Sequence, residues 1–94
     1  MNNYIVKHIF KSEDARSQCL ALMDSMSPAD MAAALTGENA VCKMNWNDGV
    51  ASMNMYCWWQ ATDGKSVISQ LGQLNDFFTS EPIKMDNVTD IQAG

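Results

Sequence analysis

The sequence predicts an α+β domain in which one four-stranded antiparallel sheet carries both helices on the same face. Three observations carry this prediction. Patterns typical of strands and helices follow one another in the order strand, helix, strand, strand, helix, strand. An Asp-Gly pair separates the two middle strands, as in a hairpin. The chain has 94 residues, of which 47% are hydrophobic, so we expect a single domain over residues 1–94.

The first half of the chain predicts a strand, a helix and a short added helix. Residues 3–10 are rich in β-branched and aromatic side chains at both alternating positions, which is typical of a buried strand. Ser12 is a favourable N-cap for the helix that follows, and two acidic residues come directly after it. Ser27 provides a second cap with Pro28 at the first helical position, so we expect a break there. Gly37 is placed to end this short helix.

Residues 40–47 and 50–60 predict the two strands of a hairpin. The Asp48-Gly49 pair fits a two-residue type I′ turn, which places Asn47 opposite Val50. On one face this register pairs Met44 with Met53, Cys42 with Met55, and Ala40 with Cys57. On the other face it pairs Asn45 with Ser52, Lys43 with Asn54, and Val41 with Tyr56, with Trp58 beyond. A slip of one residue exchanges the two faces, so this assignment depends on the turn.

The last part of the chain predicts a helix and a final strand. The helix starts near Asp63, and apolar residues recur along it at helical spacing. Its buried stripe consists of Val67, Leu71, Leu74 and Phe78. The tripeptide Ser80-Glu81-Pro82 ends the helix, and residues 83–88 form a weaker final strand. The complete order is that of the ferredoxin-like βαββαβ fold, in which two right-handed crossovers place the first and third strands in the centre.

Charge and cysteine content argue against several classes of function. Six Lys and Arg against eleven Asp and Glu give a net charge of −5, and the basic residues are scattered singly, so we expect neither nucleic acid nor a membrane as a partner. The start of the chain lacks signal-peptide features. Three cysteines without a C-x-x-C pair fit neither a disulfide framework nor a zinc ribbon, and free thiols favour the cytoplasm. We expect no cofactor and no metal.

One face of the predicted sheet has no helix to cover it. The first strand presents to that face either the set Tyr4, Val6, His8 and Phe10 or the set Ile5 and Ile9. The third strand adds Tyr56 and Trp58. Either choice leaves an apolar patch that is too large for a typical monomer. We therefore expect a homodimer in which the sheet of one copy covers the sheet of the other.

Three motifs support a resemblance to a known family: Tyr4-x-Val6-x-His8-x-Phe10, Met44-Asn45-Trp46 and Cys57-Trp58-Trp59. With the length and strand order, they resemble the dimeric α/β-barrel superfamily, and more narrowly a family of small bacterial domains of unknown function. The superfamily includes antibiotic-biosynthesis-type monooxygenases, muconolactone-isomerase-like proteins and stress-responsive barrel proteins. The resemblance spans nearly the whole chain and implies a ferredoxin-like domain that dimerises through its sheet. The cofactor-free monooxygenases use an Asn and a Trp four residues later on one strand face, a spacing that Asn54 and Trp58 match.

The mixed polar and aromatic face of the sheet predicts a ligand-binding site. Its residues are His8, Asn54, Tyr56 and Trp58. His8 is the only histidine, and a histidine titrates near neutral pH, so it could act as a general base or orient a ligand. We expect a small apolar or aromatic molecule to bind in a cavity beside the sheet. The alternatives are a cofactor-free monooxygenase or isomerase for a phenolic or enolisable substrate, and a dimerisation module without a ligand; no catalytic residue is assigned.

The sulfur-containing side chains have two interpretations. Soft ligands for Cu(I) could come from Cys42, Met44, Met53, Met55 and Cys57. The same residues make an ordinary flexible core under the helices, which we favour because the chain has no second histidine. Cys19, Cys42 and Cys57 are expected to be buried structural thiols rather than nucleophiles.

Overall fold

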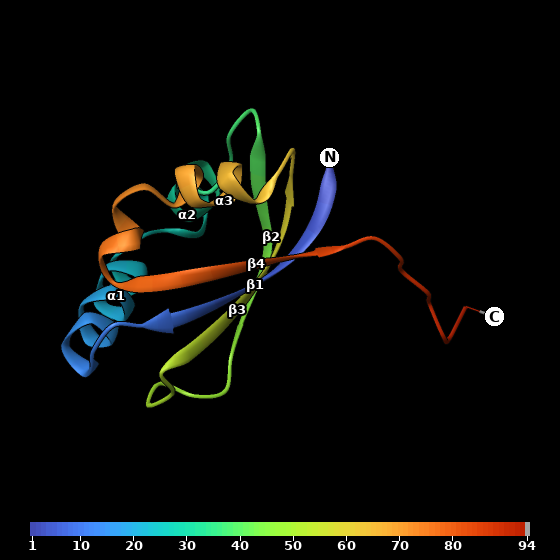
Figure 1. Ribbon diagram of the computed structural model, residues 1–94. Helices are drawn as coiled ribbons and strands as arrows, with labels where there is room; N and C mark the ends of the chain where they lie inside the picture. The colour runs from blue at the N-terminus through green and yellow to red at the C-terminus, as the bar shows by residue number, and fades with distance from the viewer. Residues whose placement is uncertain (94) are drawn as a thin grey trace.

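A computed structural model, which describes residues 1–93, has the predicted α+β architecture. Its elements are β1 (Asn2–Phe10), α1 (Glu13–Ser25), α2 (Pro28–Ala34), β2 (Ala40–Asn47), β3 (Asn54–Ala61), α3 (Gly64–Leu71), the 3-10 helix η1 (Gly72–Asp76) and β4 (Phe78–Met85). The strands form one antiparallel sheet in the order β2-β3-β1-β4, so the first and third strands are central, as predicted. The helices lie together on one side of this sheet (Figure 1). We call this side the covered face and the opposite side the open face.

The alternation of β1 decides which of its side chains meet the helices. Tyr4, Val6, His8 and Phe10 are buried on the covered face. The intervening residues, including Ile5 and Ile9, are half-buried and lie on the open face. Sequence alternation identified these two sets and left open which one the helices cover, because both are apolar. The structure assigns the set that contains His8 to the interior.

The two predicted helix starts are confirmed. The hydroxyl of Ser12 accepts a hydrogen bond from the Ala15 backbone N–H at 3.0 Å, and the hydroxyl of Ser27 accepts one from the Asp30 N–H at 3.1 Å. Pro28 is the first residue of α2, as predicted. These bonds satisfy backbone donors that a helix leaves free at its start. The chain therefore breaks between α1 and α2 where the second cap stands.

The predicted role of Gly37 is wrong. α2 ends at Ala34, and Gly37 does not adopt a positive φ. Instead, Gly37 lies against the side chain of Gln70, because a Cβ added there would clash with the Gln70 amide. Gln70 in turn donates a hydrogen bond to the Ala34 carbonyl at 3.0 Å. A larger residue at this position therefore requires the Gln70 side chain to move.

The predicted two-residue turn of the hairpin is also wrong. β2 ends at Asn47 and β3 starts at Asn54, so residues 48–53 form a longer loop. Asn47 lies opposite Met55 instead of Val50. The side chain of Arg16 on α1 donates a hydrogen bond to the Ala51 carbonyl at 2.8 Å, which holds this loop against the helix. An Asp-Gly pair favours a tight turn, and here contacts outside the hairpin override that local preference.

The helix in the second half of the chain ends earlier than its apolar spacing predicts. The predicted helix was to continue to Phe78, but α3 ends at Leu71 and η1 follows it. Gly72 has a φ of 57°, which stops the α-helix, and Asn75 donates hydrogen bonds to carbonyls of Ile68 and Gly72 at 2.9 Å. β4 therefore starts at Phe78, five residues before the predicted strand. Its proline is tolerated because β4 is an edge strand.

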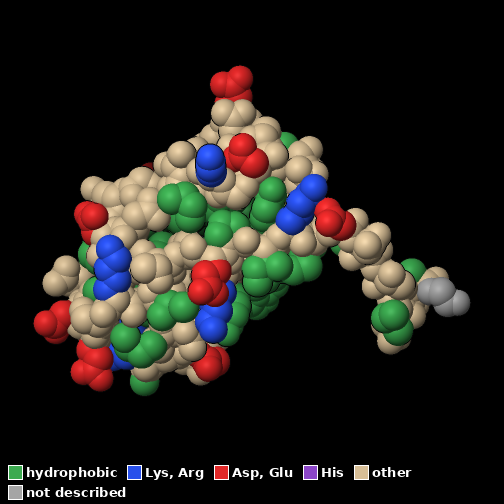
Figure 2. Space-filling view, viewed as in Figure 1, with side chains coloured by type: hydrophobic (Ala, Val, Ile, Leu, Met, Phe, Trp, Pro, Cys, Tyr) green, Lys and Arg blue, Asp and Glu red, His purple; other side chains and the backbone are tan. Residues whose placement is uncertain are grey.

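The open face carries many of the exposed large apolar side chains. Those that project from its strands are Met44, Trp46, Tyr56 and Ile83. Figure 2 shows hydrophobic side chains along the side of the sheet that faces away from the helices, up to the start of the C-terminal tail. Residues 86–93 extend from the end of β4 as this tail (Figure 1). Among the described residues, no helix is long and apolar enough to cross a membrane.

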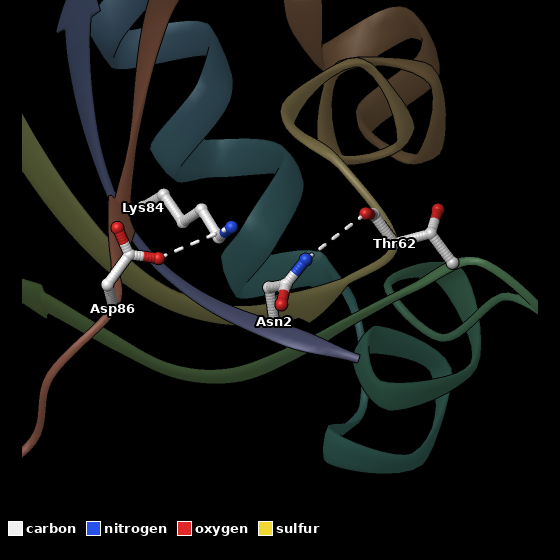
Figure 3. Close-up of polar contacts among 4 residues, drawn as sticks. All are labelled: Asn2, Thr62, Lys84 and Asp86. Carbon is white, nitrogen blue, oxygen red and sulfur yellow. Dashed lines mark hydrogen bonds and ion pairs between the residues drawn. The ribbon is translucent and has the colours of Figure 1, made fainter.

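Polar contacts hold the ends of the central and edge strands. The Asn2 side chain donates a hydrogen bond to the Thr62 carbonyl at 3.4 Å, which joins the start of β1 to the segment after β3. Lys84 in β4 forms an ion pair with Asp86 at 3.3 Å (Figure 3). Both contacts lie at the surface, where such interactions contribute little to stability. The core on the covered face is the main source of stability.

Candidate functional site

The candidate site is a cavity of about 350 Å³ between the covered face and the helices. Its walls come from every strand of the sheet and from α1, α2, α3 and η1. Most lining side chains are apolar and several are flexible, among them Met23, Met31, Leu35, Met55 and Leu74. The polar lining groups are His8, Cys42, Lys43, Asn45, Cys57 and Trp59. This combination of apolar walls and a few polar groups is typical of small-molecule sites.

His8 lies in the wall of this cavity and is completely buried. Its Nδ1 shares a hydrogen bond with the Ser80 hydroxyl across β1 and β4 at 2.7 Å. Its ring packs on Phe78 with the centroids 4.4 Å apart. Its Nε2 meets no partner at hydrogen-bonding geometry among the described residues, although the ring lies close enough to Cys57 to lower the pKa of that thiol. The ring is thus held in place at one nitrogen while the other is left unsatisfied inside the protein.

Trp59 presents a second unsatisfied polar atom in the same wall. The residue is completely buried on β3, and its indole Nε1 has no partner within residues 1–93. An unsatisfied buried polar group costs about 1–3 kcal/mol, so each of these two atoms beside one cavity calls for a partner. An indole N–H only donates, whereas the free nitrogen of His8 donates or accepts according to the tautomer. The cavity therefore offers unused hydrogen-bonding capacity.

A β-bulge in β2 delivers a further polar side chain to the cavity. Between Cys42 and Met44 the register with β3 shifts by one residue. As a result Met44 lies opposite Trp58 and is 51% exposed, and Asn45, which lines the cavity, lies opposite Cys57. The amide of Asn45 donates a hydrogen bond to the Cys57 sulfur at 3.0 Å. Bulges commonly re-aim one side chain in this way beside functional sites.

The environment of Cys57 favours its ionised form. Its pKa is lowered from 9.0 to about 5, chiefly by a side-chain hydrogen bond with Cys42, with further contributions from His8 and Asn45, while burial opposes them. The pKa of Cys42 is raised, because its thiol hydrogen-bonds to Cys57, is partly buried and lies beside the same negative charge. The pair therefore ionises more readily at Cys57 than at Cys42. Cys19 differs from both, since burial raises its pKa to about 11.

The four residues predicted to bind a ligand lie on opposite sides of the sheet. His8 is at the cavity, whereas Asn54, Tyr56 and Trp58 are on the open face of β3. The indole of Trp58 donates a hydrogen bond to the Asn3 side chain at 3.0 Å. Strand alternation requires this separation, because His8 pairs with Met55 and so shares its face with the odd-numbered residues of β3. The Asn54 and Trp58 pair does share one face, as the spacing predicted.

Several cavity residues were missed by the sequence interpretation. Cys42, Met55 and Cys57 were correctly placed together on one face but interpreted as plain core. Asn45 was assigned to the opposite face, because a bulge leaves no clear signal in the sequence. Trp59 carried a usable signal, since a tryptophan that alternation places under helices needs a partner for its N–H. In the part of the chain that the structure describes, no cluster of three or more His, Cys, Asp or Glu residues could hold a metal ion.

The fold and cavity define a small ferredoxin-like α+β domain with a pocket between its sheet and its helices. No protein-family model, curated protein or solved structure matches the chain. The fold alone does not define an activity, so the indications of function are the residues of the cavity.

Proposed function

We propose that the protein is a cytoplasmic binder of a small, mainly apolar or aromatic molecule, which occupies the cavity between the sheet and the helices. One observation carries the proposal: two buried polar atoms, His8 Nε2 and Trp59 Nε1, lack partners among the described residues beside a 350 Å³ cavity with apolar walls. A cavity of this size lies within the range of about 300–1,000 Å³ that is usual for ligand sites. A ligand that bonds to these atoms would remove the cost of leaving them unsatisfied.

The same atoms limit the chemistry of the ligand. Trp59 Nε1 needs an acceptor, so the ligand carries an oxygen such as that of a phenol or a carbonyl group. His8 Nε2 is suited to the same oxygen of the ligand. When His8 Nδ1 accepts the hydrogen bond from the Ser80 hydroxyl, the ring proton is on Nε2 and can be donated to the ligand. The flexible methionines of the wall adapt to the outline of an aromatic ring. A phenolic or aromatic carbonyl compound therefore fits better than a sugar or a nucleotide.

Adjacent tryptophans on opposite faces of β3 provide a matched test. We expect a panel of phenols, quinols and aromatic ketones, measured by isothermal titration calorimetry, to include a compound whose affinity falls about tenfold or more in Trp59→Phe. Trp58→Phe makes the same change on the open face and leaves that affinity unaltered. A loss of affinity in Trp58→Phe alone, or no binding by any compound of the panel, contradicts the proposal. Oxygen uptake with the quinols distinguishes simple binding from catalysis by a cofactor-free monooxygenase.

We propose in addition that two copies of the chain pair through their open faces, as in the dimeric α/β-barrel superfamily that the sequence resembles. The support is the apolar character of that face, on which Met44 and Ile83 are 51% exposed and Trp46 is 45% exposed. We expect native mass spectrometry to report a dimer, and Tyr56→Asp to convert it to a monomer because the charge would be buried. Val50→Asp, in the exposed hairpin loop, is the control and stays dimeric. A monomeric wild type contradicts this proposal and leaves the cavity proposal standing.

A further inference from the structure

Cys42 and Cys57 form a pair that the proposed ligand binding does not use. They stand on neighbouring strands, β2 and β3, and both line the cavity. The Cys42 thiol donates a hydrogen bond to the Met44 carbonyl at 3.7 Å, and the Cys57 sulfur accepts one from Asn45 at 3.0 Å. Cys42 is partly exposed and Cys57 is buried. The pair therefore connects the surface of the protein with the inner wall of the cavity.

The backbone around this pair permits the two sulfur atoms to approach further. In the register, Cys42 lies opposite Trp59, two residues from Cys57 along β3. Such diagonal neighbours have Cα atoms about 7–8 Å apart, whereas a disulfide needs about 4.4–6.8 Å. The β-bulge directly after Cys42 bends and twists the strand at this point, and β2 is the edge strand of the sheet. Closing the disulfide therefore requires this edge strand to move towards β3 by about 1 Å.

We propose that Cys42 and Cys57 are a peroxide-reactive dithiol that closes to an intramolecular disulfide in the wall of the cavity. The Cys57 thiolate attacks one oxygen of a hydroperoxide, the O–O bond breaks, and the sulfur becomes a sulfenic acid, while the other oxygen takes a proton from solvent and leaves as water or an alcohol. The Cys42 sulfur then attacks the Cys57 sulfur, and an S–S bond replaces the S–O bond. The departing hydroxide takes the Cys42 proton and leaves as water. Two thiols are thus oxidised by two electrons and one hydroperoxide is reduced.

The assignment of roles follows from the surroundings of each sulfur. Asn45 donates to the Cys57 sulfur at 3.0 Å, and His8 is close enough to stabilise its negative charge. Cys42 lines the same cavity from the neighbouring strand and is the more exposed of the two thiols, so it is the one assigned to close the disulfide. Cys19 lies buried on α1 and is not among the residues that line the cavity. It serves as an internal reference for an ordinary buried thiol.

The test treats the whole protein with hydrogen peroxide, blocks the remaining thiols with N-ethylmaleimide and maps tryptic peptides by mass spectrometry. Cleavage after Lys43 separates Cys42, in residues 17–43, from Cys57, in residues 44–65. We expect a disulfide that joins these two peptides, formed at least about tenfold faster than any oxidation of Cys19. Fragmentation of the linked peptides in wild-type protein identifies the two cysteines without any substitution.

Variants separate the proposed pair from the third cysteine. Cys19→Ser keeps the link, whereas Cys42→Ser loses it and accumulates a Cys57 sulfenic acid that dimedone traps. The proposal is overturned by a disulfide that includes Cys19 or by one that joins two chains. Free glutathione in the same tube shows that the peroxide is active. If the glutathione is oxidised while all three protein thiols stay reduced, the proposal is overturned as well. The experiment contains no small-molecule ligand for the cavity, so each of these outcomes tests the dithiol and leaves the ligand-binding proposal unaffected.

Discussion

The hydrogen bond from Asn45 to Cys57 yields a quantitative prediction. Replacing Asn45 with leucine keeps a side chain of similar size and removes the amide N–H that lies 3.0 Å from the Cys57 sulfur. A hydrogen bond to a charged group contributes about 1.5–3 kcal/mol, and one pKa unit corresponds to about 1.4 kcal/mol. Because the bond stabilises the thiolate form, its loss raises the Cys57 pKa. We expect a rise of about one to two units above the value of about 5 in the native protein.

The assay measures the reaction of each cysteine with a small uncharged thiosulfonate as a function of pH. Only the thiolate reacts, so the Cys57 rate should rise up to about pH 6 and then stay level. The rate of Cys19, whose pKa is about 11, should instead rise tenfold per unit through the neutral range. At pH 7 the thiolate fractions differ about 10⁴-fold, and the lower nucleophilicity of the more acidic thiol reduces this to about 20-fold in favour of Cys57.

A matched control and a clear contrary result complete the experiment. Asn54→Leu makes the same substitution on the open face of β3, and it should leave the pH midpoint of Cys57 unchanged. A native pH midpoint of Cys57 in Asn45→Leu contradicts the role given to this hydrogen bond. A Cys57 rate that still rises tenfold between pH 7 and 8 in the native protein refutes it as well, because that is the behaviour of an ordinary thiol.

Three further predictions concern stability. Phe78→Ala, which removes a buried ring packed on His8, should cost about 3–5 kcal/mol and lower Tm by roughly 20 °C in thermal unfolding, while the exposed Thr79→Ala should change little. In denaturant titrations, the free energy of unfolding of wild type minus that of Cys57→Ser should grow as pH rises from 5 to 9. The reason is that a thiol whose pKa is lower in the folded state stabilises the fold at pH values above that pKa. A difference that shrinks with pH is the contrary result. Gly37→Ala should displace the Gln70 side chain and cost about 1 kcal/mol, and in a double-mutant cycle with Gln70→Ala most of that cost should disappear.

Local patterns in the chain were sufficient to predict the type and order of the elements. The caps at Ser12 and Ser27 depend on side-chain bonds within four residues, so they are visible in the sequence and were confirmed. The strand order followed from the handedness of the crossovers, which applies to all such folds. The end of α3 was misjudged, because the apolar spacing up to Phe78 continued past Gly72, whose positive φ stops the helix.

The composition of the site was decided by tertiary structure. Both residue sets of β1 are apolar, so only the packing of the helices could place His8 inside and away from Trp58. The long hairpin loop and the bulge after Cys42 change the register from the predicted one. Before the bulge, each β2 residue pairs four positions further along β3 than predicted, and after the bulge it pairs five positions further along. An even shift leaves every side chain on its predicted face, which is why Cys42 stayed with Cys57. An odd shift exchanges the faces, and that alone brings Asn45 to the thiolate.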